Sequence, residues 1–164
     1  LLYKNREALR LGIELLNLPA NSGVAINAFT CFVVDQAVIA AGCVPEYLDV
    51  NQQTLNFTPE SLESLAKRNS HLKAVVVQNT LGYPCDITRI KAICSKYALT
   101  LIEDLAHSDG GTYESDEAIG SVGDLTILSF SQDKIVDAVF WIFVSAIESF
   151  VIIKIISWKR KSNS

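Results

Sequence analysis

The chain has 164 residues, of which 49% are hydrophobic and 20% are charged, and its formal net charge at pH 7 is −4. This length is sufficient for one domain with a buried core. The negative net charge gives no basic patch of the kind that binds nucleic acid, so we expect no nucleic-acid partner.

The cysteines and histidines lack the spacing of a metal site. No two cysteines form a C-x-x-C pair, and each lies in or beside an apolar segment (Cys31, Cys43, Cys85 and Cys94). We interpret them as reduced thiols of a cytoplasmic protein, and we expect neither a disulfide framework nor a metal. The first residues have no signal-peptide pattern. Because the sequence contains no methionine, even at position 1, we expect it to be a fragment.

Alternating helical and strand-like segments follow one another along the chain. Helical periodicity and capping residues predict helices over 6–17, 30–41, 58–67 and 86–97. Thr30, Thr58 and Asp86 are the expected N-caps, and Gly42 is the expected stop after the second helix. Apolar runs predict strands over 24–26, 46–50, 72–77, 99–103 and 125–130. This order predicts a three-layer α/β/α domain with a mostly parallel sheet.

Polar residues follow several of the predicted strands. Ligands in such sheets bind beyond the carboxyl ends of the strands. The residues there are Asn27, Asp49, Gln78, Asn79, Asp104, Ser129 and Ser131. Polar residues end strands in many proteins, so a single position predicts little. Their convergence at one edge of the sheet predicts a site.

Two segments within this set suggest a particular cofactor. Asp104 ends one strand, and Ser129 and Ser131 precede a lone amine, Lys134. An acid, a cluster of hydroxyls and a lysine are what a protein needs to hold pyridoxal 5′-phosphate. The lysine forms a Schiff base, the hydroxyls bind the phosphate, and the acid keeps the pyridine nitrogen protonated.

The sequence changes character at about residue 140. Residues 140–164 are first apolar without a clear period and then basic, so we predict a domain over 1–139 followed by a divergent tail. The span 136–157 is long enough for a membrane helix, but Asp137, Glu148 and Lys154 interrupt it. We therefore favour a tail foreign to the domain, and membrane contact by the tail remains the alternative.

Ordered motifs between residues 5 and 139 resemble the DegT/DnrJ/StrS family of sugar aminotransferases, which are fold type I pyridoxal phosphate enzymes. The motifs are N-A-F-T at 27–30, A-G-C-V-P-E-Y-L-D-V at 41–50, L-N-F-T-P-E at 55–60, L-G-Y-P-C-D at 81–86, I-E-D-L-A-H at 102–107, G-S-V-G-D at 120–124 and S-F-S-Q-D-K at 129–134. The family resemblance implies a large cofactor domain, here incomplete at its N-terminus, with the small C-terminal domain missing.

The resemblance also implies roles for individual residues. Lys134 matches the Schiff-base lysine that also moves the proton, and Asp104 matches the partner of the pyridinium nitrogen. His107 matches the residue beside the 3-hydroxyl group of the ring. Ser129 matches the serine that binds the cofactor phosphate.

Further positions are implied at the cofactor. Arg6 and Glu7 lie where the family has a phosphate-binding loop at a helix N-terminus. Cys31 occupies the position where many relatives have an aromatic residue that stacks on the ring.

The function implied is amination of a nucleotide-linked keto-sugar in amino-sugar, polysaccharide or lipopolysaccharide biosynthesis. Glutamate is the usual amino donor, and the intact family acts as homodimers. One alternative is a non-catalytic fragment or pseudoenzyme that retains the fold and binds cofactor or a partner. A dehydratase of the same family carries histidine in place of the lysine, so Lys134 favours transamination. A flavodoxin-like or receiver-like module is another alternative, but residues 27–30 contain no glycine for its phosphate loop.

Overall fold

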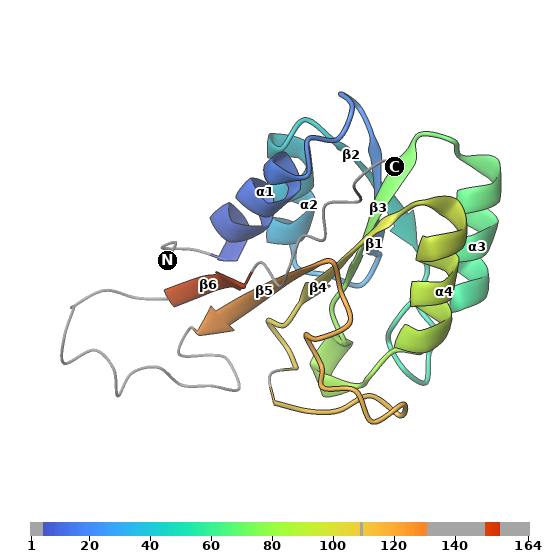
Figure 1. Cartoon of the computed structure of the whole chain (residues 1–164), viewed down its shortest axis with the longest axis vertical. Coiled ribbons are helices and arrows are strands. Elements are labelled where there is room, and N and C mark those ends of the chain that lie inside the picture. The colour runs from blue at the N-terminus through green and yellow to red at the C-terminus, as the bar shows by residue number, and fades with distance from the viewer. Residues whose placement is uncertain (1–4, 109, 131–149, 155–164) are drawn as a thin grey trace, which may run out of the picture.

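The computed structural model describes residues 5–108, 110–130 and 150–154 (Figure 1). Six strands form one sheet in the order β2-β1-β3-β4-β5-β6. The strands are β1 (Gly23–Asn27), β2 (Val44–Leu48), β3 (Leu72–Val77), β4 (Thr100–Asp104), β5 (Leu125–Phe130) and β6 (Phe150–Lys154). The helices are α1 (Asn5–Leu15), α2 (Phe32–Ala40), α3 (Pro59–Arg68), α4 (Ile87–Tyr97) and the 3₁₀ turn η1 (Thr80–Gly82).

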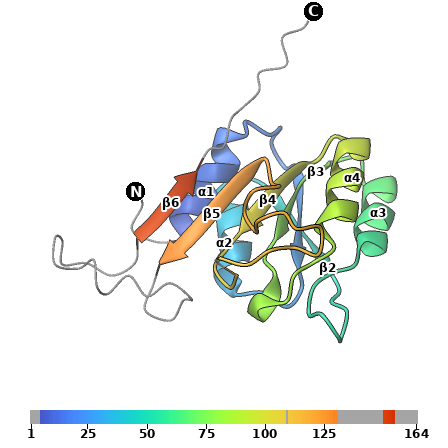
Figure 2. The same ribbon diagram turned by 60° about the horizontal axis from the view of Figure 1, so that its bottom comes forward.

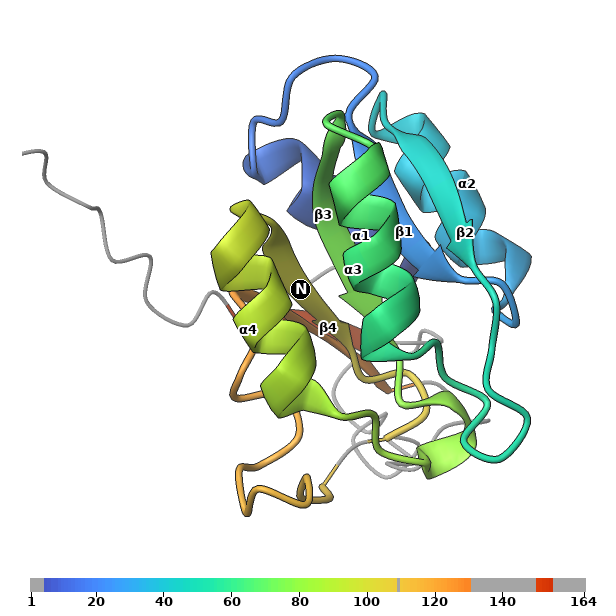
Figure 3. The same cartoon turned by 90° about the vertical axis from the view of Figure 1, so that its right-hand side faces the viewer.

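Helices cover both faces of the sheet, which confirms the predicted three-layer α/β/α architecture. Helices α1 and α2 lie on one face, and α3 and α4 lie on the other (Figures 1 and 3). Alternate residues of each central strand point to opposite faces. Val76 and Ile102 therefore pack in the core under α1 and α2, whereas Val77 and Leu101 pack in the core under α3 and α4.

In the series β2-β1-β3-β4-β5, every neighbouring pair of strands is parallel. Parallel pairing needs crossover connections between consecutive strands, which α2, α3, α4 and the segment 105–124 provide. Their carboxyl ends therefore lie along one edge of the sheet, the lower edge in Figure 3. The sequence predicted this edge as the location of the site.

Capping explains where α3 and α4 begin, as the sequence predicted. The Thr58 hydroxyl accepts a hydrogen bond from the Ser61 amide at 3.2 Å, and Pro59 occupies the first helical position. The Asp86 carboxylate accepts one from the Arg89 amide at 3.1 Å. Gly42 follows α2 with a φ of +76°, which suits glycine at a helix end.

Two predicted boundaries are corrected by the structure. Helix α2 begins at Phe32 and not at residue 30, because the Thr30 hydroxyl bonds to Gln78 and does not cap the helix. Strand β2 spans Val44–Leu48 and not 46–50, since its pairing runs from Gly23↔Val44 to Asn27↔Leu48. Pro45 is tolerated there because β2 is an edge strand of the sheet.

Strand β6 was not predicted from the sequence. It lies within the predicted tail and pairs antiparallel with β5, from Thr126↔Lys154 to Phe130↔Phe150 (Figure 2). The remaining residues of 140–164 lie outside the described residues, so the boundary at 139/140 stays a prediction. In the part of the chain that the structure describes, no helix is both long and apolar enough to cross a membrane.

Candidate active site

Consecutive acids at the end of β4 point to opposite faces of the sheet. Asp104 alternates with Ile102, which packs under α1 and α2, and Glu103 alternates with Leu101, which packs under α3 and α4. Both carboxylates are completely buried. Each needs hydrogen-bond donors in place of water, and the two acids obtain them from different parts of the chain.

Asp104 receives donors from the turn that follows β4 and from the end of β3. Its Oδ1 accepts a hydrogen bond from the Ala106 amide at 3.2 Å. Its Oδ2 accepts one from Nε2 of Gln78 at 3.5 Å. The Oε1 atom of Gln78 accepts a hydrogen bond from the Thr30 hydroxyl. These contacts join the carboxyl ends of β3 and β4 to the segment that leads into α2.

Glu103 receives four donors on the opposite face. Its Oε2 accepts hydrogen bonds from the Tyr113 hydroxyl and the Gly120 amide, each at 2.7 Å. Its Oε1 accepts one from the Val122 amide at 2.8 Å and another from the Gly123 amide. The carboxylate therefore holds the turn at 120–123 against β4. This set of donors identifies Glu103 as a structural acid.

The Glu103 contacts extend to the loop after β3. Asn79 donates to the Tyr113 hydroxyl at 3.0 Å, and its Oδ1 accepts from the Cys85 amide at 3.0 Å. Asn79 has a left-handed backbone (φ 49°, ψ 61°), which asparagine tolerates better than most residues. Burial, and next the nearby negative charge of Glu103, raise the pKa of Tyr113. The phenol therefore remains a hydrogen-bond donor.

Two helix N-termini meet at the same edge. Arg6, in the first turn of α1, donates to Oε1 of Gln36 at 2.8 Å and lies over the ring of Phe32 at 6.0 Å. Phe32 is the first residue of α2, which follows β1. Glu7 accepts from Nε of Arg10 at 2.9 Å. The structure thus brings the predicted phosphate-binding helix start beside α2.

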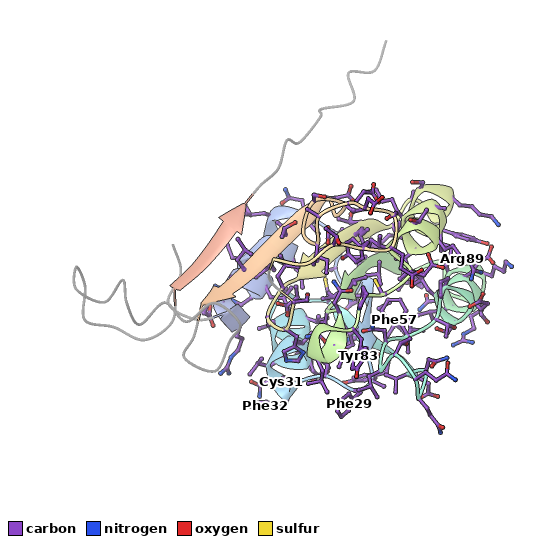
Figure 4. The ribbon with its side chains drawn as sticks, turned by 90° about the horizontal axis from the view of Figure 1, so that it is seen from below. Phe29, Cys31, Phe32, Phe57, Tyr83 and Arg89 are labelled. Carbon is purple, nitrogen blue, oxygen red and sulfur yellow. The ribbon has the colours of Figure 1, made fainter. Side chains whose placement is uncertain are left out.

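Aromatic and thiol side chains are exposed at this edge. Cys31 is the N-cap residue of α2 and makes no side-chain capping bond. Figure 4, which views the molecule from below, labels Phe29, Cys31 and Phe32 near the start of α2 and Tyr83 after η1. Phe29, Phe32 and Tyr83 are 55%, 64% and 53% exposed. Exposed aromatic surface therefore lies at the same edge as Cys31, which the family resemblance predicts to lie beside the cofactor ring. The other three cysteines are buried free thiols.

The remaining predicted site residues are described to different extents. His107 is half-buried in the turn after β4, three residues beyond Asp104. Ser129 lies in the last part of β5, where its backbone pairs with Val151. Lys134 and Ser131 lie outside the described residues. Among the described residues, no group of three His, Cys, Asp or Glu side chains could hold a metal ion.

Sequence reasoning missed several residues that support the site. In the sequence, Gln78 is one of several polar residues that end strands, Thr30 is predicted to cap a helix, and no motif distinguishes the roles of Glu103 and Tyr113. The alternation along β4 could have separated the two acids, because Leu101 and Glu103 share one face and Ile102 and Asp104 share the other. No local pattern could have predicted the Glu103–Tyr113 contact.

The fold, together with the buried acid at the carboxyl end of β4, indicates the class of protein to which the chain belongs. A mostly parallel sheet between two helical layers, with such an acid, is the architecture of the large domain of fold type I pyridoxal phosphate-dependent transferases. The sequence profile of the DegT/DnrJ/EryC1/StrS aminotransferase family matches residues 6–140. The chain belongs to this family, as its motifs predicted.

Individual relatives agree with this assignment. The chain is 32% identical over 127 residues to the spore coat polysaccharide biosynthesis protein SpsC of Bacillus subtilis (strain 168), covering 77% of this chain and 32% of SpsC. It is 28% identical over 127 residues to the GDP-perosamine synthase of Vibrio cholerae, covering 77% of this chain and 34% of that enzyme.

A solved structure supports the same fold. The aminotransferase from Psychrobacter cryohalolentis superposes with a TM-score of 0.79 at 30% identity, over 90% of this chain and 35% of that one. The chain spans about a third of the length of these relatives.

Proposed function

We propose that the chain is part of a pyridoxal phosphate-dependent aminotransferase of nucleotide-linked keto-sugars. The observation that carries the proposal is the buried Asp104 carboxylate at the carboxyl edge of β4, within a family match over residues 6–140. An acid at that position suits a protonated ring nitrogen, because burial strengthens the attraction between the two charges.

The residues present fit the cofactor at both of its polar ends. Asp104 would pair with the ring nitrogen. The amides in the first turn of α1, at Arg6 and Glu7, have no partner within the helix and suit a phosphate. Ser129, at the end of β5, is the family-implied phosphate ligand. The exposed Cys31 is the implied neighbour of the ring face.

The bound cofactor supplies an electron sink that stabilises negative charge beside its ring. Asp104 would hold the proton on the ring nitrogen, which maintains that capacity. Lys134 would bind the cofactor covalently through Nζ and then use the same atom to move a proton. His107, in the turn after β4, would orient the 3-hydroxyl side of the ring.

The names of two relatives support a sugar substrate, and the family resemblance implies the amino donor and the assembly. One relative is named a GDP-perosamine synthase and another a spore coat polysaccharide biosynthesis protein. We propose a nucleotide-linked keto-sugar as the amino acceptor, glutamate as the donor and a homodimer as the assembly of the intact protein. The cytoplasmic location stays a prediction.

The experiment is a cofactor titration of the purified chain followed by visible absorption. The wild-type chain should develop the band of lysine-bound cofactor, and borohydride should remove the band and label Lys134 covalently. Lys134→Ala should develop no such band. Lys67→Ala is the matched control, because Lys67 is exposed on α3, which covers the face of the sheet opposite to Asp104.

The same titration can reject the proposal. A folded wild-type chain that forms no lysine-dependent band would indicate a non-catalytic fragment that retains the fold. A band that persists in Lys134→Ala would assign the covalent role to another amine.

A further inference from the structure

Gln78 lies between two polar side chains from distant parts of the sequence. It follows β3, is 5% exposed, and its Nε2 donates to Oδ2 of the fully buried Asp104 at 3.5 Å. Its Oε1 accepts a hydrogen bond from the Thr30 hydroxyl. The distance to Asp104 is at the long end of the hydrogen-bond range. Because both groups are buried, little water competes for that contact.

The donor and acceptor chemistry gives this chain of contacts one direction. An ionised carboxylate only accepts hydrogen bonds, so Asp104 requires the NH₂ side of the Gln78 amide. The carbonyl side of Gln78 is then turned to Thr30, whose hydroxyl donates. Each of the three side chains thus constrains the orientation of its neighbour. Thr30 fixes the amide of Gln78, and the amide fixes one oxygen of Asp104.

The contacts also reach the segment next to the predicted ring position. Thr30 immediately precedes Cys31, the N-cap residue of α2. The orientation of the Asp104 carboxylate is therefore coupled to the chain that would lie against the cofactor ring. A carboxylate oxygen has room for more than one donor, so the bond from Gln78 is compatible with a bond from a ring N–H.

We infer that Gln78, held by Thr30, is a positioning residue that keeps the Asp104 carboxylate oriented toward the ring nitrogen of the cofactor. This inference rests on the proposed function. A donor to the carboxylate favours its charged form, and only the charged form pairs with a protonated ring nitrogen. Removing the donor leaves Asp104 buried with one fewer hydrogen bond, so its pairing with the ring weakens.

The test compares two ligands that differ only at the ring nitrogen. Pyridoxal 5′-phosphate and its 1-deaza analogue, which has carbon in place of that nitrogen, are titrated against the full chain and their dissociation constants are measured. The wild-type chain should bind the nitrogen-containing ligand more tightly. Gln78→Leu replaces the amide with a side chain of similar volume that has no donor. It should raise the dissociation constant of that ligand about tenfold and that of the analogue about twofold or less.

Two further variants separate positioning from folding. Thr30→Val removes the hydroxyl that donates to the Gln78 amide and leaves the contacts of Asp104 in place. It should raise the dissociation constant of pyridoxal 5′-phosphate about threefold and leave that of the analogue unchanged. Gln52→Leu, at an exposed loop position, is the matched control and should change neither dissociation constant. If Gln78→Leu fails to fold, the selective effect of Thr30→Val still decides the question.

The outcomes distinguish this inference from the proposed function. Equal weakening of both ligands would assign Gln78 a purely structural role, and unchanged dissociation constants would assign it no role. Either result overturns the inference and leaves the proposed function in place. A wild-type chain that binds both ligands equally would contradict the pairing of Asp104 with the ring nitrogen, and with it the proposal for Gln78.

Discussion

Glu103 and Asp104 are consecutive in β4, yet their carboxylates serve opposite faces of the sheet. Asp104 accepts from Gln78 and Ala106 on the side of α1 and α2. Glu103 accepts from Tyr113 and from amides of the turn at 120–123 on the side of α3 and α4. The same change, acid to amide, should therefore affect ligand binding at one residue and folding at the other.

Asp104→Asn should weaken pyridoxal 5′-phosphate binding by at least about tenfold, because a neutral amide cannot pair with a protonated ring nitrogen. Its Oδ1 can still accept from the Ala106 amide, and its new NH₂ group meets one donor, Nε2 of Gln78, whereas each Glu103 oxygen accepts from two donors. Its cost in the free energy of unfolding should therefore be smaller than that of Glu103→Gln. Absorption titration with the cofactor and urea unfolding measure the two effects. Full cofactor affinity in Asp104→Asn would contradict the assignment of this acid.

Glu103→Gln should lower the free energy of unfolding by about 3 kcal/mol, because the new NH₂ group meets N–H and O–H donors where an acceptor is required. Urea unfolding followed by circular dichroism measures the change. Glu114→Gln is the control, since Glu114 is exposed, and its effect should be within about 0.5 kcal/mol. Equal stability of the two variants would exclude a structural role for Glu103.

Gly120→Ala should also destabilise the turn that Glu103 holds. Gly120 has a φ of +91°, and an added Cβ would lie 2.6 Å from Cδ1 of Leu105. Backbone strain and steric overlap together should lower the free energy of unfolding by about 3 kcal/mol. Gly42→Ala is the matched control, because its φ is +76° with nothing within 4 Å, and it should cost about 1 kcal/mol. Thermal unfolding of both variants should show this order, and equal losses would argue against the overlap.

Alkaline pH should destabilise the chain through its buried thiols. Burial raises the pKa of Cys85 and of Cys94 to about 12 in the folded state, and the charge of Glu103 adds to the effect at Cys85. An unfolded thiol titrates at about 8.5. The contribution of each thiol is therefore complete below about pH 8.5 and is lost as the pH rises toward the folded value.

The expected loss is about 2 kcal/mol per thiol at about pH 10. Urea unfolding at several pH values measures it. The double variant Cys85→Ala/Cys94→Ala should have a shallower alkaline slope, whereas Cys31→Ala, at an exposed thiol, should keep the slope of the wild type. An unchanged slope in the double variant would assign the alkaline effect to other groups, among them Tyr113, whose raised pKa acts in the same direction.

The order of helices α1 to α4 and strands β1 to β5 could be predicted because local periodicity and capping residues indicate them. Thr58 and Asp86 cap α3 and α4 as their sequences predicted. Local patterns were insufficient where an element depends on its neighbours. Strand β2 includes Pro45 because β2 lies at the edge of the sheet, and β6 exists through its pairing with β5.

The same division applies to the candidate site. The sequence by itself determined that Asp104 ends a buried strand in a family of aminotransferases, because that information lies in one run of residues. Only the tertiary structure decided which donors reach Asp104 and which reach Glu103. Those donors are distant along the chain, with Gln78 26 residues from Asp104 and Thr30 48 residues from Gln78. Such contacts arise when parallel strands bring their carboxyl ends to one edge, and no local pattern contains them.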